Sequence, residues 1–106
     1  MNAALIDSLR KQCDGPRDGA LLRFSLGSAL LGEGELDAAI GELRHALDFD
    51  PAYSAAWKLL GKACQQAGQL QAAADAWRSG IDVAASRGDK QAEKEMTVFL
   101  RRLEKA

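Results

Sequence analysis

Apolar residues recur along this chain at intervals of three and four positions, the spacing of residues on one face of an α-helix. Leu22, Leu26 and Leu30 form one such stripe, which resumes at Leu36 and Ile40 after the polar stretch GEGE. A second pair of stripes follows the same plan, with the sequence QAGQ between them. Because two helices joined by a short turn form a helical hairpin, the pattern predicts two successive hairpins.

These two hairpins are copies of one unit, because the sequence repeats at an interval of 34 residues. The stretch FSLGSALLGEGELDAAI, residues 24–40, is matched by KLLGKACQQAGQLQAAA, residues 58–74. The same interval relates residues 3–13 to the second half of the first unit, which predicts a leading half unit there. A fixed period of this length is the mark of a helical repeat protein rather than of a generic helical bundle.

The chain after the second unit loses the period but keeps an amphipathic helical pattern, with its apolar positions at Ala92, Met96, Phe99 and Leu103. A stack of repeats leaves its last apolar face uncovered, and a terminal helix with a polar outer side covers that face. We therefore expect a single domain over 1–106. Its expected parts are a leading half repeat at 3–14, a first repeat at 20–53, a second at 54–87 and a capping helix at 88–104.

The repeated residues resemble the tetratricopeptide repeat (TPR) family, whose pattern is W-x2-L-G-x2-Y, then A-x3-F, then P. The second unit carries the first six of these positions as Trp57, Leu60, Gly61, Cys64, Ala73 and Trp77. The first unit carries the pattern as Arg23, Leu26, Gly27, Leu30, Ala39, Leu43 and Pro51. The resemblance implies an all-α, TPR-type α-solenoid of antiparallel helix hairpins, with about six helices and a C-terminal capping helix.

Individual residue types fit particular places in such a hairpin. Gly27 and Gly61 would let the first helix of each unit approach the second closely, and Gly34 and Gly68 would form the turns. Arg23 departs from the pattern, since it stands where a large apolar residue is usual. It predicts a first helical turn that is rotated or loosely packed.

Composition adds few constraints. Hydrophobic residues make up 47% of the chain and charged residues 27%, as in an ordinary soluble domain. A formal net charge of −1 argues against a general nucleic-acid binder, which needs a positive surface. Asp7 within the first apolar stretch, and the lack of a basic segment before it, do not suit a secretory signal. No uncharged apolar run approaches the roughly 18 residues of a membrane span, so a cytoplasmic protein is expected.

Candidate chemistry is sparse, and we predict no catalytic residues, no metal, no cofactor and no enzymatic activity. His45 is the one histidine in the sequence and lies off the apolar stripe, so we expect it on the surface. Cys64 lies on an apolar stripe, which predicts a packed, inert thiol, whereas Cys13 is expected to be partly exposed at a helix end. The stretch GEGE lacks the lysine and the preceding strand of a phosphate-binding loop.

The resemblance also implies a binding surface, because TPR relatives bind peptide segments in a concave groove lined by the first helix of each repeat. Helical register assigns to that groove Leu21, Phe24, Ser28, Leu31, Ala55, Lys58, Lys62 and Gln65. Lys58 and Lys62 are four residues apart and share a helical face, which predicts a partner with acidic and apolar side chains. The alternative is that these lysines are ordinary solvated charges and that Phe24 packs against a neighbour.

One TPR subclass grips the C-terminal carboxylate of chaperones with lysine and asparagine side chains. Phe24 and Ser28 stand where that clamp would need them, so it is not expected here. The favoured function is an adaptor that binds a partner polypeptide in the groove. Structural self-association and a non-catalytic role within a larger complex remain open as alternatives.

Overall fold

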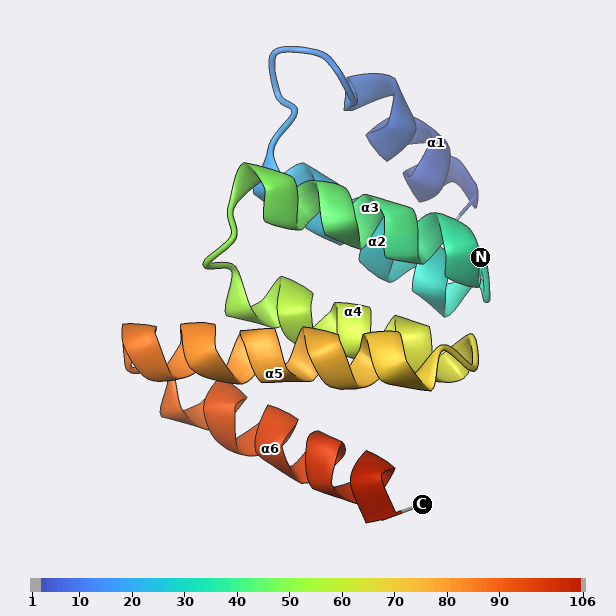
Figure 1. The fold of residues 1–106 in the computed structure, drawn as a ribbon. Coiled ribbons are helices and arrows are strands. Elements are labelled where there is room, and N and C mark those ends of the chain that lie inside the picture. The colour runs from blue at the N-terminus through green and yellow to red at the C-terminus, as the bar shows by residue number, and fades with distance from the viewer. Residues whose placement is uncertain (1–2, 106) are drawn as a thin grey trace.

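Helices account for almost all of the residues that the structure, a computed structural model, describes, which are 3–105. The six helices in this range are α1 (Ala3–Gln12), α2 (Ala20–Gly32), α3 (Leu36–Phe49), α4 (Ser54–Gln66), α5 (Leu70–Arg87) and α6 (Lys90–Lys105). Figure 1 shows them stacked in chain order as antiparallel neighbours. The predicted all-α solenoid with a C-terminal capping helix is confirmed.

Short turns with glycine join the two helices of each hairpin. Gly34, between α2 and α3, and Gly68, between α4 and α5, both have φ of +77°, a conformation that is costly for residues with a Cβ atom. Beyond each glycine the chain closes the turn in the same way. The amide of Glu35 donates to the carbonyl of Leu30 at 3.0 Å, and that of Gln69 to Cys64 at 2.9 Å. This pattern satisfies carbonyls that the helix end leaves free.

Close helix contact within each hairpin also follows from glycine. A Cβ atom on Gly27 would lie 2.8 Å from Cγ of Leu43, and one on Gly61 would overlap the indole of Trp77. Both large side chains are buried, with exposures of 0% and 1%. The predicted close approach of the two helices is therefore confirmed, and the second helix of each hairpin fills the space that its partner's glycine leaves.

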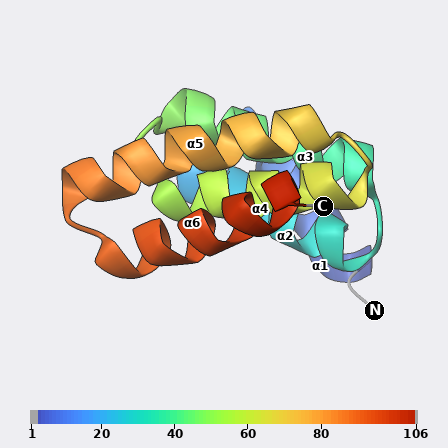
Figure 2. The ribbon, with the colours of Figure 1, turned by 60° about the horizontal axis from the view of Figure 1, so that its bottom comes forward.

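The helices form two layers, with α2, α4 and α6 on one side and α3 and α5 on the other (Figure 2). The central helix, α4, contacts α2, α3, α5 and α6. The largest fully buried side chains come from five of the helices and are Trp77, Leu26, Leu30, Leu43, Leu60, Met96 and Cys64. The capping helix α6 thus contributes Met96 to the core as well as covering it.

Arg23 corrects one expectation, because it is buried and firmly bound rather than loosely packed. Its residue exposure is 7%. Its guanidinium donates to both carboxylate oxygens of Asp18, from Nε at 2.9 Å and from Nη2 at 2.8 Å, and from Nη1 to Oε1 of Glu42 at 2.8 Å. A buried charge is tolerated where carboxylates pair with it in this way. The arginine therefore ties the loop before α2 to α3.

Over residues 3–105, none of the helices combines the length and the apolar character that a membrane crossing requires.

Candidate partner-binding groove

The structure distributes the predicted groove residues unevenly along α2 and α4. Leu21, Ser28 and Gln65 are exposed, Leu21 at 69%. The remaining five are partly buried, and they are Phe24, Leu31, Ala55, Lys58 and Lys62. Only part of the predicted surface is therefore directly available to a partner.

Phe24 belongs to the packing between helices. Its ring centroid lies 5.0 Å from that of Tyr53, which precedes α4, and the two planes are tilted by 33°. It also packs against the buried core cluster. The contact with Tyr53 agrees with the alternative, in which Phe24 packs against a neighbour.

The two lysines of α4 each meet a side chain of α6. Nζ of Lys58 donates to Oε1 of Glu95 at 3.0 Å, and this bond holds the pKa of the Glu95 carboxyl below its usual value. Nζ of Lys62 lies 4.8 Å from the ring centroid of Phe99, within the range of a cation–π interaction. Lys58 is thus paired with a carboxylate, whereas within residues 3–105 the contact recorded for the Lys62 ammonium is with a neutral ring.

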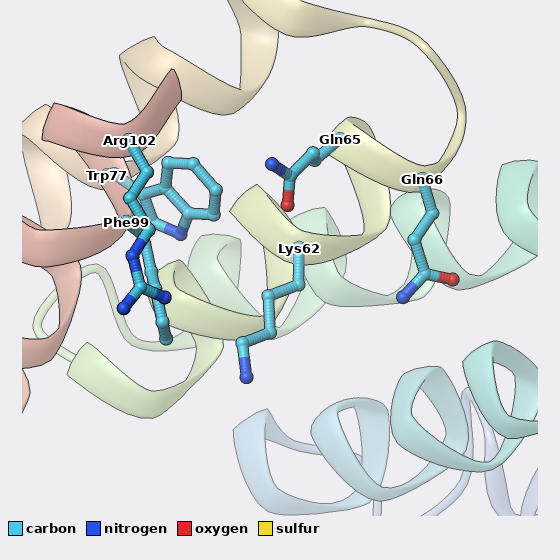
Figure 3. Close-up of a pocket in the computed structure, with 6 residues that line it drawn as sticks. All are labelled: Lys62, Gln65, Gln66, Trp77, Phe99 and Arg102. Atoms are coloured by element: carbon cyan, nitrogen blue, oxygen red, sulfur yellow. The ribbon is translucent and has the colours of Figure 1, made fainter. Parts of the chain in front are cut away.

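A pocket of about 350 Å³ opens beside the contact between Lys62 and Phe99. It lies between α4 and α6, next to Trp77 of α5. It is lined by Lys62, Gln65, Gln66, Trp77, Phe99 and Arg102. Figure 3 shows Arg102 and Phe99 together on the α6 side and Lys62 with the two glutamines on the α4 side. The structure therefore brings predicted groove residues of α4 together with residues of the capping helix.

Aromatic rings form the apolar part of this pocket. The ring centroids of Trp77 and Phe99 are 5.5 Å apart and their planes are tilted by 46°. The Trp77 Nε1–H donates to the carbonyl of Lys58 at 3.1 Å, which fixes the orientation of the indole. A pocket with rigid aromatic walls and a few polar groups at its edge is a usual form of binding site.

The charge of the pocket is positive. Lys62 and Arg102 are its charged residues, and among residues 3–105 neither forms an ion pair within 4.0 Å. Carboxylates of α6 pair with other cations, Glu95 with Lys58 and Glu104 with Arg78. The hydrogen bond from Lys58 lowers the pKa of Glu95 most, and Lys62 adds to that effect. Both cations can thus pair with an anionic group of another molecule.

Sequence reasoning missed Phe99 and Arg102, because it treated the last helix only as a cover. A signal was present in the sequence. An offset of 36 residues, rather than 34, superposes the buried positions Ala56 and Leu60 on Ala92 and Met96. With that offset, α6 takes the place of the first helix of a further repeat, but Phe99 and Arg102 match Ala63 and Gln66, which are not among the predicted groove positions.

The structure also gives the surroundings of the two cysteines and of the histidine. Cys64 is fully buried, and burial raises the pKa of its thiol. Cys13 is partly buried, and burial raises the pKa of its thiol as well. The His45 side chain is 54% exposed, and its Nδ1 lies 2.8 Å from Nη1 of Arg23. Both thiols are thus kept protonated, and the histidine contributes to the Arg23 cluster.

Two comparisons with known proteins both identify the tetratricopeptide repeat. A tetratricopeptide repeat family model matches residues 30–81. A TPR repeat-containing protein of Pseudomonas aeruginosa is 52% identical over 102 residues, which is 96% of this chain and 97% of that protein.

Two solved structures are also similar to this chain. The solution structure of a Bordetella parapertussis protein is 48% identical, with a TM-score of 0.82 over 95% of this chain and 88% of that one. A TPR domain protein from Salinibacter ruber, also solved in solution, is 23% identical, with a TM-score of 0.77 over 86% of this chain and 91% of that one. The second likeness concerns the fold alone.

Proposed function

Since this chain belongs to the tetratricopeptide repeat family, we propose that it is a non-catalytic interaction module that binds a segment of a partner protein. The segment would lie along the face formed by α2, α4 and α6. The observation that supports this assignment best is the pocket between α4 and α6, whose Phe99 ring and polar edge come from helices of that face. A folded partner would not be required, because a helix or an extended segment can follow such a surface.

Residues exposed on this face allow a direct test. Ser28 on α2 and Gln65 on α4 are exposed, so replacing both by tryptophan would fill the groove without disturbing the core. A matched control replaces Ala38 on α3 and Gln71 on α5, which are exposed in the opposite layer. Both double variants add the same two large side chains.

Affinity capture from the native cell extract, followed by mass spectrometry and binding of the purified partner, measures the effect. A partner retained by wild type and by the Ala38→Trp, Gln71→Trp control, but lost by the Ser28→Trp, Gln65→Trp variant, supports the proposal. Equal retention by both variants would place binding on another surface. Recovery of this chain alone would favour self-association instead.

A further inference from the structure

We infer that the pocket between α4 and α6 receives an acidic side chain of the partner segment, next to an apolar one. This inference rests on the proposed function, which it makes more specific. It depends on the two cations of the pocket, on its aromatic wall and on the exposed amides at its edge.

The two cations come from different helices but line one pocket, so a carboxylate that enters it lies in the positive field of both. Lys62 lies on α4 and Arg102 on α6, and both line the same pocket (Figure 3). The Lys62 ammonium is positioned over the Phe99 ring, 4.8 Å from its centroid. The planar guanidinium of an arginine can donate two parallel hydrogen bonds to a carboxylate, while a lysine acts as a point charge.

The other residues of the pocket can contact the parts of the partner next to that carboxylate, which are a neighbouring side chain and the peptide backbone. The partly buried Phe99 ring offers an apolar surface for a neighbouring side chain, with the fully buried Trp77 ring packed behind it. Gln65 and Gln66 are exposed at the edge, where their amides can both donate to and accept from a peptide backbone. An acidic side chain can reach inward while its backbone stays at the level of these glutamines, whereas a terminal carboxylate would bring the backbone itself into the pocket.

Three other surface pockets of the described residues contain carboxylates that offset their cations. The pocket between α1 and the end of α2 is lined by three carboxylates, Asp7, Glu33 and Glu35, against one arginine. Two pockets on the opposite side share Arg44, but each also contains a carboxylate, Asp48 or Asp75. An acidic group is therefore better matched to the pocket between α4 and α6 than to these three.

The outer side of α6 provides a control surface. Its shallow pocket is also rich in cations, with Lys90, Lys94 and Arg101, but it contains Glu93 and no aromatic ring. Replacing Lys94 and Arg101 by glutamate changes the net charge of the chain as much as replacing Lys62 and Arg102 does. The two double variants therefore separate a specific pocket from general attraction to a basic helix.

The probe is a short peptide in which glutamate alternates with leucine, acetylated and amidated so that it has no charged terminus. Its partner probe is the same peptide with glutamine in place of every glutamate. The readout is the tryptophan indole region of an NMR spectrum of the ¹⁵N-labelled chain. Of its two tryptophans, Trp77 lines the pocket, and Trp57 lies on the opposite side.

We expect the glutamate peptide to shift the Trp77 indole signal and to leave that of Trp57 in place. The glutamine peptide should bind about tenfold more weakly or worse, because it loses hydrogen bonds in which both groups are charged. Lys62→Glu with Arg102→Glu should abolish the shift, whereas Lys94→Glu with Arg101→Glu should retain it. The thermal midpoint of each variant verifies that it is folded.

Four outcomes would overturn the inference. They are equal binding of the two peptides, no shift at Trp77 with millimolar glutamate peptide, equal loss in both charge variants, and binding only of a peptide with a free C-terminal carboxylate. The proposed function is tested separately. If the Ser28→Trp, Gln65→Trp variant loses the native partner and the Lys62→Glu, Arg102→Glu variant keeps it, the groove function stands and the acidic-side-chain assignment fails.

Discussion

Replacing Gly61 by alanine tests the contact between α4 and α5 most directly. The added Cβ atom would overlap Nε1 and Cε2 of Trp77 and would lie 2.5 Å from its Cδ1. Carbon atoms in ordinary contact are about 3.5–4.0 Å apart. Because the indole is rigid and only 1% exposed, it has little room to move aside. The two helices must therefore separate, or the indole must leave its position.

The size of the effect follows from opposing contributions. Alanine in a helix interior is favoured over glycine by about 0.5–1 kcal/mol. Overpacking a core costs typically about 1–3 kcal/mol. Displacing Trp77 also weakens its 3.1 Å hydrogen bond to the carbonyl of Lys58, which is a further loss of about 1 kcal/mol. The expected net loss in the free energy of unfolding for Gly61→Ala is about 1–3 kcal/mol, and a larger loss is expected for Gly61→Leu.

Gly41 on α3 supplies the matched control. It lies in a helix interior like Gly61, but a Cβ atom there would meet nothing within 4 Å. Gly41→Ala should therefore stabilise the chain by about 0.5–1 kcal/mol. Urea unfolding followed by circular dichroism measures both variants against wild type. If the two alanine variants shift the midpoint in the same direction, the contact between Gly61 and Trp77 is misplaced.

Trp77→Ala should cost about 3–5 kcal/mol in the same assay, since the side chain is fully buried, and a loss below about 1 kcal/mol would put it on the surface. Gly68→Ala should destabilise by about 1–2 kcal/mol because φ is +77°, and Gly68→Asn by less; equal losses would argue against this turn. The bond to Arg23 holds the pKa of the Asp18 carboxyl far below its usual value, so this carboxylate stabilises the fold at neutral pH. That contribution is fully present above about pH 4, the ordinary pKa of an aspartate, and is lost progressively as the pH falls from there towards the lowered pKa of the folded state. The difference in urea midpoint between wild type and Asp18→Asn should therefore be smaller at pH ~3 than at pH ~7. A difference that does not change with pH would contradict the proposed ion pair.

The fold could be predicted from the sequence because its determinants are local and repeated. Helix stripes and turn glycines lie within one unit, and each appears twice, 34 residues apart. The close contacts at Gly27 and Gly61 follow from the same pattern. Our division of the chain into repeats at 20–53 and 54–87 remains a prediction.

The cluster around Arg23 could not be predicted in this way. Its strongest partner, Asp18, lies in the loop before α2, and Glu42 is 19 residues away on α3. Neither position belongs to the repeated pattern. The pairing depends on how the loop folds back, which the helical periodicity does not encode, so a departure from the pattern was wrongly interpreted as loose packing.

The candidate site was predicted in part for a related reason. Lys62 and Gln65 follow from the helical register of α4. Phe99 and Arg102 do not, because the spacing of α6 differs by two residues from the main period and its charged surface is typical of a cap. Nor could the Lys58–Glu95 pair be anticipated, since it depends on the angle at which α6 crosses α4.

The stacking order of the helices has a consequence for how the chain acquires its structure during synthesis. Each helix contacts only helices one or two places away along the chain (Figure 1). Such short-range contacts favour fast folding, and a chain emerging from the ribosome can pack its first helices before the later ones exist. The pocket, however, needs α4, α5 and α6 together. A nascent chain can therefore pack its first helices before the pocket exists, and the pocket forms only when the sixth helix docks.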